Sequence, residues 1–297
     1  MIVPPSGQPL WTAQADRPIA IAPDASRFVY RASGNNGVNV ELMVRAIDQL
    51  DARVLSLPGD PGFREPIVSA DGTWVAFFVA GELRKASLVG GPAVTVARVG
   101  GAPRGASWGE NDLIVFATSD VSRGLMTVPA AGGQLSVLTR PGVGEAAHVF
   151  PSFLPGATAV LFTIVTPGGP SDSSQVAVLD LKTGARKVLV RGGSQAEYVP
   201  SGHLVFAAAG ALRAVPFDLG RLEIVGDAVT VVEHVLVATT GEASFAVSRT
   251  GSLLYVPAAG GDAEGQQNSA ATPATLVLAL NWGEELKRLA PRKIAAK

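Results

Sequence analysis

The chain has 297 residues, with 24 Lys plus Arg, 25 Asp plus Glu and no cysteine. A net charge of −1 argues against a general nucleic-acid-binding surface, which needs a basic excess on one face. The absence of cysteine excludes disulfides, cysteine zinc sites and thiol nucleophiles. Its apolar runs, such as 275–280 and 229–238, are too short or carry charge, so we expect no direct membrane insertion. The 34 Gly and 21 Pro favour short strands over long helices.

A repeat of about 45 residues runs along the chain. Six times, a turn segment is followed by a short β-rich run that ends in an aromatic residue, and these aromatic anchors are spaced 47, 39, 46, 44 and 49 residues apart. The anchors are Tyr30, Phe77, Phe116, Phe162, Phe206 and Tyr255. Four short strands with their turns fill such an interval, whereas a helical solenoid would show a 3.6-residue periodicity. The repeat therefore predicts an all-β fold: a six-bladed β-propeller of four-stranded antiparallel blades.

The first and last segments complete this prediction. Residues 1–259 contain the blades, and 19–22 should form the inner strand of the first blade. The composition of 260–273 is that of a flexible linker. Residues 274–297 then supply a closing strand (275–280), which should pair with the incomplete last blade, and a short C-terminal helix (282–289) of the same domain.

Two sets of motifs resemble known families. Ser69-Ala-Asp-Gly-Thr-Trp-Val-Ala-Phe-Phe78 resembles the repeat of TolB-like, WD-related six-bladed propellers. Segments 45–50, 105–109, 150–155 and 280–289 are similar to the propeller that follows the transmembrane segment of many bacterial serine/threonine protein kinases. The kinase motifs, a Gly-rich loop with its lysine and a His-Arg-Asp loop, do not occur in the sequence. The resemblance implies a sensor or interaction region, placed outside the cytoplasmic membrane, although the chain carries no signal-peptide or transmembrane pattern.

Catalytic motifs are scarce. Gly105-Ala106-Ser107-Trp108-Gly109 matches a nucleophile elbow, but a polar turn and a strand follow it instead of a helix, so we expect an inner strand. Among the histidines, His203 is expected to be a solvated turn residue and His234 an outward-facing one. No calcium loop, phosphate loop or dinucleotide fingerprint occurs, and we expect no cofactor and no metal site.

A group of polar residues recurs about 13 positions before the aromatic anchors. In a propeller this place lies at one mouth of the central channel, where loops of every blade converge. Guanidinium groups there would suit an anionic or zwitterionic ligand or a peptide. The candidate ligand-binding residues are Arg17, Arg64, Arg104, His148, Glu197 and Glu242.

The sequence thus predicts a non-catalytic module that binds a protein or peptide partner or a small anionic ligand. Two alternatives stay open: a propeller hydrolase or lyase with an active site at the channel mouth, and a truncated relic of a kinase–propeller fusion. Compartment and oligomeric state are not predicted.

Overall fold

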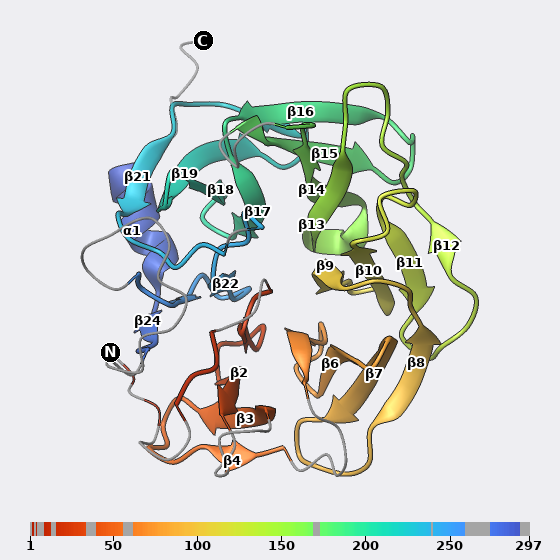
Figure 1. Ribbon diagram of the computed structural model, residues 1–297. Helices are drawn as coiled ribbons and strands as arrows, with labels where there is room; N and C mark the ends of the chain where they lie inside the picture. The colour runs from red at the N-terminus through yellow and green to blue at the C-terminus, as the bar shows by residue number, and fades with distance from the viewer. Residues whose placement is uncertain are drawn as a thin grey trace.

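The computed structural model describes residues 2, 4, 9–12, 16–33, 40–55, 62–168, 173–238, 240–258 and 274–291. Within these residues, six antiparallel sheets stand in a ring around a central axis (Figure 1). The predicted six-bladed β-propeller is confirmed. The proposed linker, 260–273, lies outside the described residues.

The strands of each blade follow one another from the channel outward. The first three blades each contain four strands. They are β1 (Ile19–Ile21), β2 (Arg27–Ser33), β3 (Val40–Ala46) and β4 (Arg53–Val54); β5 (Arg64–Val68), β6 (Trp74–Val79), β7 (Glu82–Ser87) and β8 (Val94–Arg98); and β9 (Pro103–Trp108), β10 (Leu113–Thr118), β11 (Met126–Pro129) and β12 (Ser136–Val137).

The fourth blade follows the same plan, and the fifth and sixth depart slightly from it. In the fifth blade both β20 and β21 pair with β19, and the described part of the sixth has three strands. The strands are β13 (Ala147–Phe153), β14 (Ala159–Val165), β15 (Gln175–Asp180) and β16 (Arg186–Arg191); β17 (Ser194–Val199), β18 (His203–Ala208), β19 (Ala211–Asp218), β20 (Glu223–Ile224) and β21 (Val229–Val232); and β22 (Phe245–Val247), β23 (Leu253–Tyr255) and β24 (Val277–Ala279). A 3₁₀ turn η1 (Pro155–Ala157) and helix α1 (Trp282–Leu289) complete the elements.

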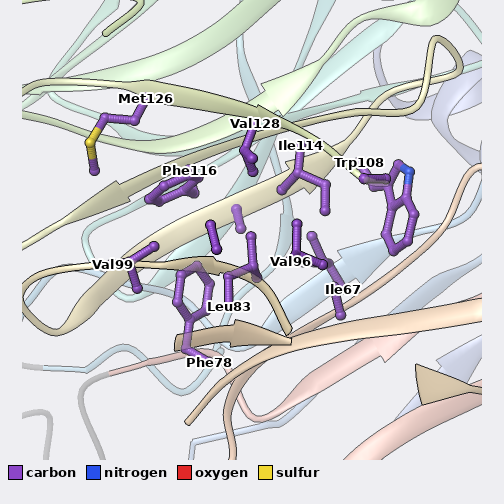
Figure 2. Packing of buried hydrophobic residues seen from close by; sticks show 14 residues of the cluster. Ile67, Phe78, Leu83, Val96, Val99, Trp108, Ile114, Phe116, Met126 and Val128 are labelled. Carbon is purple, nitrogen blue, oxygen red and sulfur yellow. The ribbon is translucent and has the colours of Figure 1, made fainter. Parts of the chain in front are cut away.

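Apolar side chains fill the spaces between neighbouring blades. Each of the six junctions holds one cluster, and that between the second and third blades is shown in Figure 2. There the rings of Phe78 and Phe116 lie 5.8 Å apart. Burying one such side chain contributes about 1.5–3 kcal/mol. Because both faces of every blade are covered, the apolar content of the chain is used in inter-blade packing.

Both ends of the described chain take part in closing the ring. Inner strand β22 contacts β1, and β24 pairs with β23, as the sequence predicted. Ile2 adds an antiparallel bridge to Leu276, with main-chain hydrogen bonds of 2.6 and 2.9 Å. No sequence pattern predicted this bridge. The sixth blade is therefore completed by the two ends of the chain together.

One prediction about the histidines is wrong. His203 is buried, and both of its ring nitrogens have partners. Nδ1 contacts the Ser201 hydroxyl at 2.9 Å, and Nε2 contacts the carbonyl oxygen of Ala290 at 2.7 Å. Helix α1 thus covers the turn that the sequence placed in solvent. His234 is exposed, as expected.

Candidate functional site

Four inner strands share a β-bulge at the same place. In β5, β9, β13 and β17 the pairing with the second strand of the blade shifts by one residue. Glu65, Gly105, Phe150 and Gln195 lie at these bulges with φ of 49°, 94°, 51° and 47°. A bulge bends its strand and redirects a side chain. All four residues line a cavity on the channel axis.

At Gly105 the channel wall is too close for a side chain. A Cβ atom there would lie 2.5 Å from Phe150 Cα, and the φ of 94° also favours glycine. The inner strands of the third and fourth blades therefore meet through a glycine. The Phe150 ring is held at the edge of the cavity as a result.

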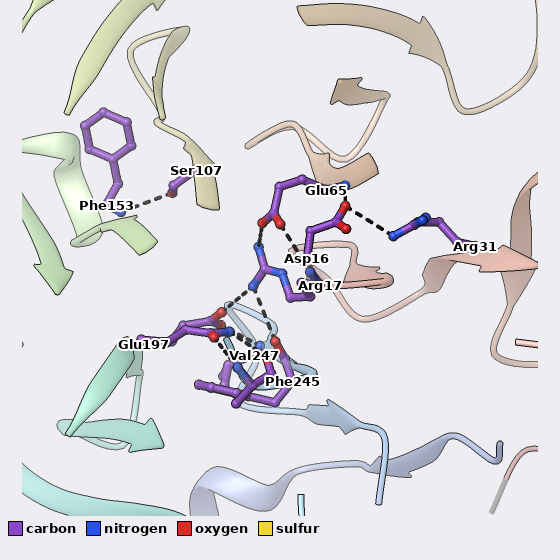
Figure 3. Close-up of polar contacts among 11 residues, drawn as sticks. Asp16, Arg17, Arg31, Glu65, Ser107, Phe153, Glu197, Phe245 and Val247 are labelled. Carbon is purple, nitrogen blue, oxygen red and sulfur yellow. Dashed lines mark hydrogen bonds and ion pairs between the residues drawn. The ribbon is translucent and has the colours of Figure 1, made fainter. Parts of the chain in front are cut away.

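Arg17 joins three blades from the segment that precedes the first. Its Nη1 lies 2.6 Å from Glu197 Oε1 and donates to the Phe245 carbonyl oxygen at 3.3 Å, while Nη2 lies 3.5 Å from Glu65 Oε1 (Figure 3). Burial alone would lower the pKa of Arg17. The negative charges of Glu65, Glu197 and Glu242 outweigh burial, so the pKa is raised above its ordinary value. The charge of the guanidinium is thus compensated by carboxylates of the protein, although its buried Nε has no hydrogen-bond partner among the described residues.

Asp16 organises a second ion-pair group beside the first. Its carboxylate lies 3.2 Å from Arg31 Nη1 and 3.3 Å from Arg64 Nε, and it accepts the Glu65 main-chain N–H at 3.0 Å. Arg31 is fully buried, and this burial lowers its pKa more than Asp16 raises it. Arg64 therefore pairs with Asp16 in the wall of the channel.

Glu65 and Glu242 form a buried pair of carboxyl groups. Burial raises the pKa of both, and for Glu242 burial together with the neighbouring Glu65 carboxyl raises the pKa well above its usual range. Glu65 Oε1 and Glu242 Oε2 each lack a hydrogen-bond donor among the described residues. A proton on Glu242 that is donated to the Glu65 carboxylate fits these directions, as in other pairs of close carboxyl groups.

Arg104 differs from the other arginines at the mouth. Its guanidinium carbon lies 5.5 Å from the centre of the Phe150 ring, and Nη2 donates to the Thr240 carbonyl oxygen at 3.1 Å. Among the described residues no carboxylate lies within ion-pair distance of it, whereas its buried Nε lacks a hydrogen-bond partner as those of Arg17 and Arg64 do. Burial lowers its pKa, while the more distant Glu242 raises it.

The cavity between these groups is small. Its volume is about 10 Å³, which is the room that one water molecule needs. Residues of the second to fifth blades, Glu242 of the sixth blade and the Arg17 segment surround it. A larger ligand at this place requires groups of the protein to move.

The structure brings five of the six predicted site residues to the channel mouth and separates His148 from them. His148 Nδ1 contacts Thr139 Oγ1 at 2.8 Å, and Nε2 contacts Glu145 Oε2 at 2.9 Å and Arg186 Nη1 at 3.1 Å. These partners lie on the outer strand β16 and on the loops between β12 and β13. Burial lowers the pKa of His148 despite Glu145. Its ring therefore lies between two blades.

The offset of His148 has a simple cause. Pairing with the second strand makes Val149 the equivalent of Arg64, since both pair with the residue that follows the aromatic anchor. A shift of one residue moves a side chain to the opposite face of a strand. Sequence counting also missed Asp16, Glu65 and Ser194; the acidic neighbours of Arg17 and Arg64 were the available signal.

Other predictions concern Ser107 and metal binding. Ser107 lies on inner strand β9 as expected, and its hydroxyl accepts the Phe153 N–H at 3.1 Å (Figure 3).

In the described part of the chain, no three His, Cys, Asp or Glu side chains gather in a way that could hold a metal ion. No helix within the same residues has the length and apolar character to cross a membrane.

Comparisons with known proteins identify the fold. No protein-family model matches the sequence, and no curated protein matches it. Among solved structures, a protein assigned as TolB from Agrobacterium tumefaciens is 14% identical, with a TM-score of 0.57 over 72% of this chain and 79% of that one. This chain shares the six-bladed propeller fold of that structure.

Further structures share this fold. TolB from Acinetobacter baumannii is 15% identical with a TM-score of 0.54 over 67% of this chain, which spans 52% of that protein. Oligogalacturonate lyase from Vibrio parahaemolyticus is 12% identical with a TM-score of 0.56 over 89% of this chain and 76% of the lyase. Because these identities are low, they show a common architecture and leave function to the residues of the site.

Proposed function

We propose that this chain is a non-catalytic binding module, similar to the sensor or interaction region of bacterial transmembrane serine/threonine kinases, and that it takes a carboxylate of a peptide or small anionic ligand at the channel mouth. The observation that carries the proposal is Arg104. Its guanidinium is half-buried on the Phe150 ring and lacks a carboxylate partner among the described residues.

An arginine in this setting suits an anionic ligand. Arg17 and Arg64 already face carboxylates of the protein, so their charges are compensated. Arg104 has lost part of its hydration without gaining a carboxylate partner. Burial therefore lowers its pKa, because the charged form is the less stable one away from water. A ligand carboxylate would restore the balance through charge-assisted hydrogen bonds, and the aromatic ring beneath the guanidinium fixes its plane.

Calorimetric titration with a short acidic peptide tests the proposal. The probe is acetyl-Ala-Glu-Ala-amide, and the same peptide with Gln in place of Glu is its uncharged counterpart. We expect Arg104→Ala to weaken binding of the acidic peptide at least about tenfold, which is 1.4 kcal/mol. Arg123→Ala removes an exposed arginine that pairs with Asp120, and it should leave the affinity unchanged. Equal affinities for all three proteins would contradict the proposal.

A hydrolase or lyase is the second candidate, and the Glu65–Glu242 pair favours it. A protonated carboxyl group beside a carboxylate is the arrangement that acid–base chemistry uses. The cavity at the pair admits about one water molecule, so a substrate, like any larger ligand, would need groups of the protein to move. Turnover of oligogalacturonate or of an ester panel that disappears in Glu242→Gln would support the enzyme instead.

We also propose that the module works outside the cytoplasmic membrane next to a membrane-bound partner. The support is the resemblance to kinase-linked propellers and the TolB-like fold. Fractionation of cells that produce the tagged protein tests this placement. Recovery in the cytoplasmic fraction alone would contradict it.

A further inference from the structure

A short segment of the sixth blade lies in the channel mouth. Residues 240–243, called the finger here, precede β22 and fold back on the chain: Val237 and Ala243 form a bridge, and Ala238 N–H donates to the Glu242 carbonyl oxygen at 2.8 Å. The finger therefore enters the mouth as the tip of a small hairpin.

Side chains from other parts of the ring hold the main chain of the finger. Arg104 donates to the Thr240 carbonyl oxygen at 3.1 Å, and the Ser194 hydroxyl donates to that of Gly241 at 3.1 Å. The Gln195 amide donates to the Ala243 carbonyl oxygen at 2.8 Å and accepts the Ala243 N–H at 2.7 Å. Such two-way pairing with the N–H and C=O of one residue is how a protein recognises a bound peptide.

The one acidic side chain of the finger points to the same charged groups. Glu242 is buried beside Glu65, and it interacts electrostatically with Arg17 and with Arg104. The finger thus offers the mouth a carboxyl group flanked by Gly241 and Ala243, two small residues that let the main chain approach closely.

We propose that the finger is a built-in ligand: the channel mouth is a site for an acidic peptide with small residues around a glutamate, and residues 240–243 occupy it until such a peptide displaces them. This inference rests on the proposed function for the place and charge of the ligand. Arg104 links the two, since it holds the finger through Thr240 and would hold the carboxylate of the incoming peptide.

The proposal has a thermodynamic consequence. When the open form is only a small fraction of the molecules, the apparent affinity for a peptide falls by that fraction. Weakening the finger without changing the rest of the mouth therefore increases affinity. Glu242→Ala does this, because it removes the carboxyl group that the finger buries beside Glu65 and leaves Arg17, Arg104, Ser194 and Gln195 in place.

Fluorescence anisotropy with a labelled peptide provides the test. The probe is the finger's own sequence, acetyl-Thr-Gly-Glu-Ala-amide, and the Gln version is its control. We expect Glu242→Ala to bind the acidic probe at least about tenfold more tightly than the wild type. The matched variant Glu233→Ala changes an exposed glutamate that follows β21, outside the finger, and should bind as the wild type does.

The outcomes separate this inference from the proposed function. If the wild type binds the probe through Arg104 and Glu242→Ala binds no more tightly, the built-in ligand is refuted and the proposed function stands. If neither protein binds any acidic peptide, both fail.

A second measurement on the wild type covers the case in which Glu242→Ala does not fold. In hydrogen exchange, a finger that can be displaced opens locally, so the amides of Gly241 and Ala243 exchange much faster than that of Val205 in β18. Exchange of all three at the rate of global unfolding would overturn the proposal.

Discussion

Arg17 and Glu197 meet across the channel, with Nη1 and Oε1 2.6 Å apart although the residues are separated by 180 positions in the sequence. The two side chains are only 11% and 14% exposed. The contact ties the segment before the first blade to the inner strand of the fifth. Charges at the centre of the ring therefore connect distant parts of the fold as well as forming the candidate site.

Removal of Arg17 should be costly. Arg17→Met leaves Glu65 and Glu197 buried without their nearest cation, and loss of one partner of a buried pair costs about 3–5 kcal/mol. Urea unfolding measures the change. Lys187→Met breaks the more exposed pair with Glu223 and should cost about 0–1 kcal/mol. A loss below about 1 kcal/mol for Arg17→Met would show that the pair does not hold the ring.

The stability of the protein should depend on the proton of the Glu65–Glu242 pair. An acid whose folded-state pKa is raised keeps its proton in the folded chain after the unfolded chain has lost it. The free energy of unfolding therefore falls as pH rises above 4.5, the ordinary pKa of glutamate, towards the raised value. The slope is at most about 1.4 kcal/mol per pH unit for one group.

Glu242→Gln isolates this effect, because an amide stays neutral and keeps a donor for Glu65. We expect the variant and the wild type to have similar stability near pH 4.5, and the variant to become the more stable as pH rises. His148, Glu197, Asp16, Arg17 and Arg104 are present in both proteins and cancel in the difference. Urea unfolding at a series of pH values measures it, and a difference that does not change with pH would contradict the shared proton.

The close approach at Gly105 predicts a large effect of one methyl group. Gly105→Ala puts a Cβ 2.5 Å from Phe150 Cα at a φ of 94°, so strain and overpacking should together cost about 2–5 kcal/mol. Thermal unfolding measures the loss. Gly184→Ala is the matched control: its φ is 73° but nothing lies within 4 Å, so only the backbone strain remains. Equal losses would mean that the contact with Phe150 is unimportant.

The sequence revealed the ring but only part of the site. The aromatic anchors are visible because each blade needs the same apolar residue between its neighbours, and five of them, from Tyr30 to Phe206, are fully buried. The bulges leave no comparable trace: Glu65, Gly105, Phe150 and Gln195 have nothing chemical in common. Counting residues back from the aromatic anchor therefore selected His148 as the equivalent of Arg64. The strand pairing of the structure shows that the equivalent residue is Val149. The finger depends on contacts across the ring, which no local pattern encodes.

The N-terminus should contribute to ring closure. Deletion of residues 1–3 removes the two main-chain hydrogen bonds between Ile2 and buried Leu276, and an unsatisfied buried main-chain group costs about 1–3 kcal/mol. Ile2→Ala keeps these bonds and loses only side-chain packing. We expect the deletion to expose the Leu276 amide to hydrogen exchange and Ile2→Ala to leave it protected; equal protection in both would rule out the bridge.

Nitrogen NMR of the arginine side chains tests most directly whether the channel mouth binds carboxylates. In the protein with ¹⁵N-labelled arginine, titration with acetyl-Ala-Glu-Ala-amide should shift the Arg104 Nε–H resonance in a saturable way, because Nε is buried without a partner. The Gln peptide should not shift it. A binding site at the mouth would be contradicted if the Arg104 resonance stayed fixed while only exposed arginines such as Arg98 responded.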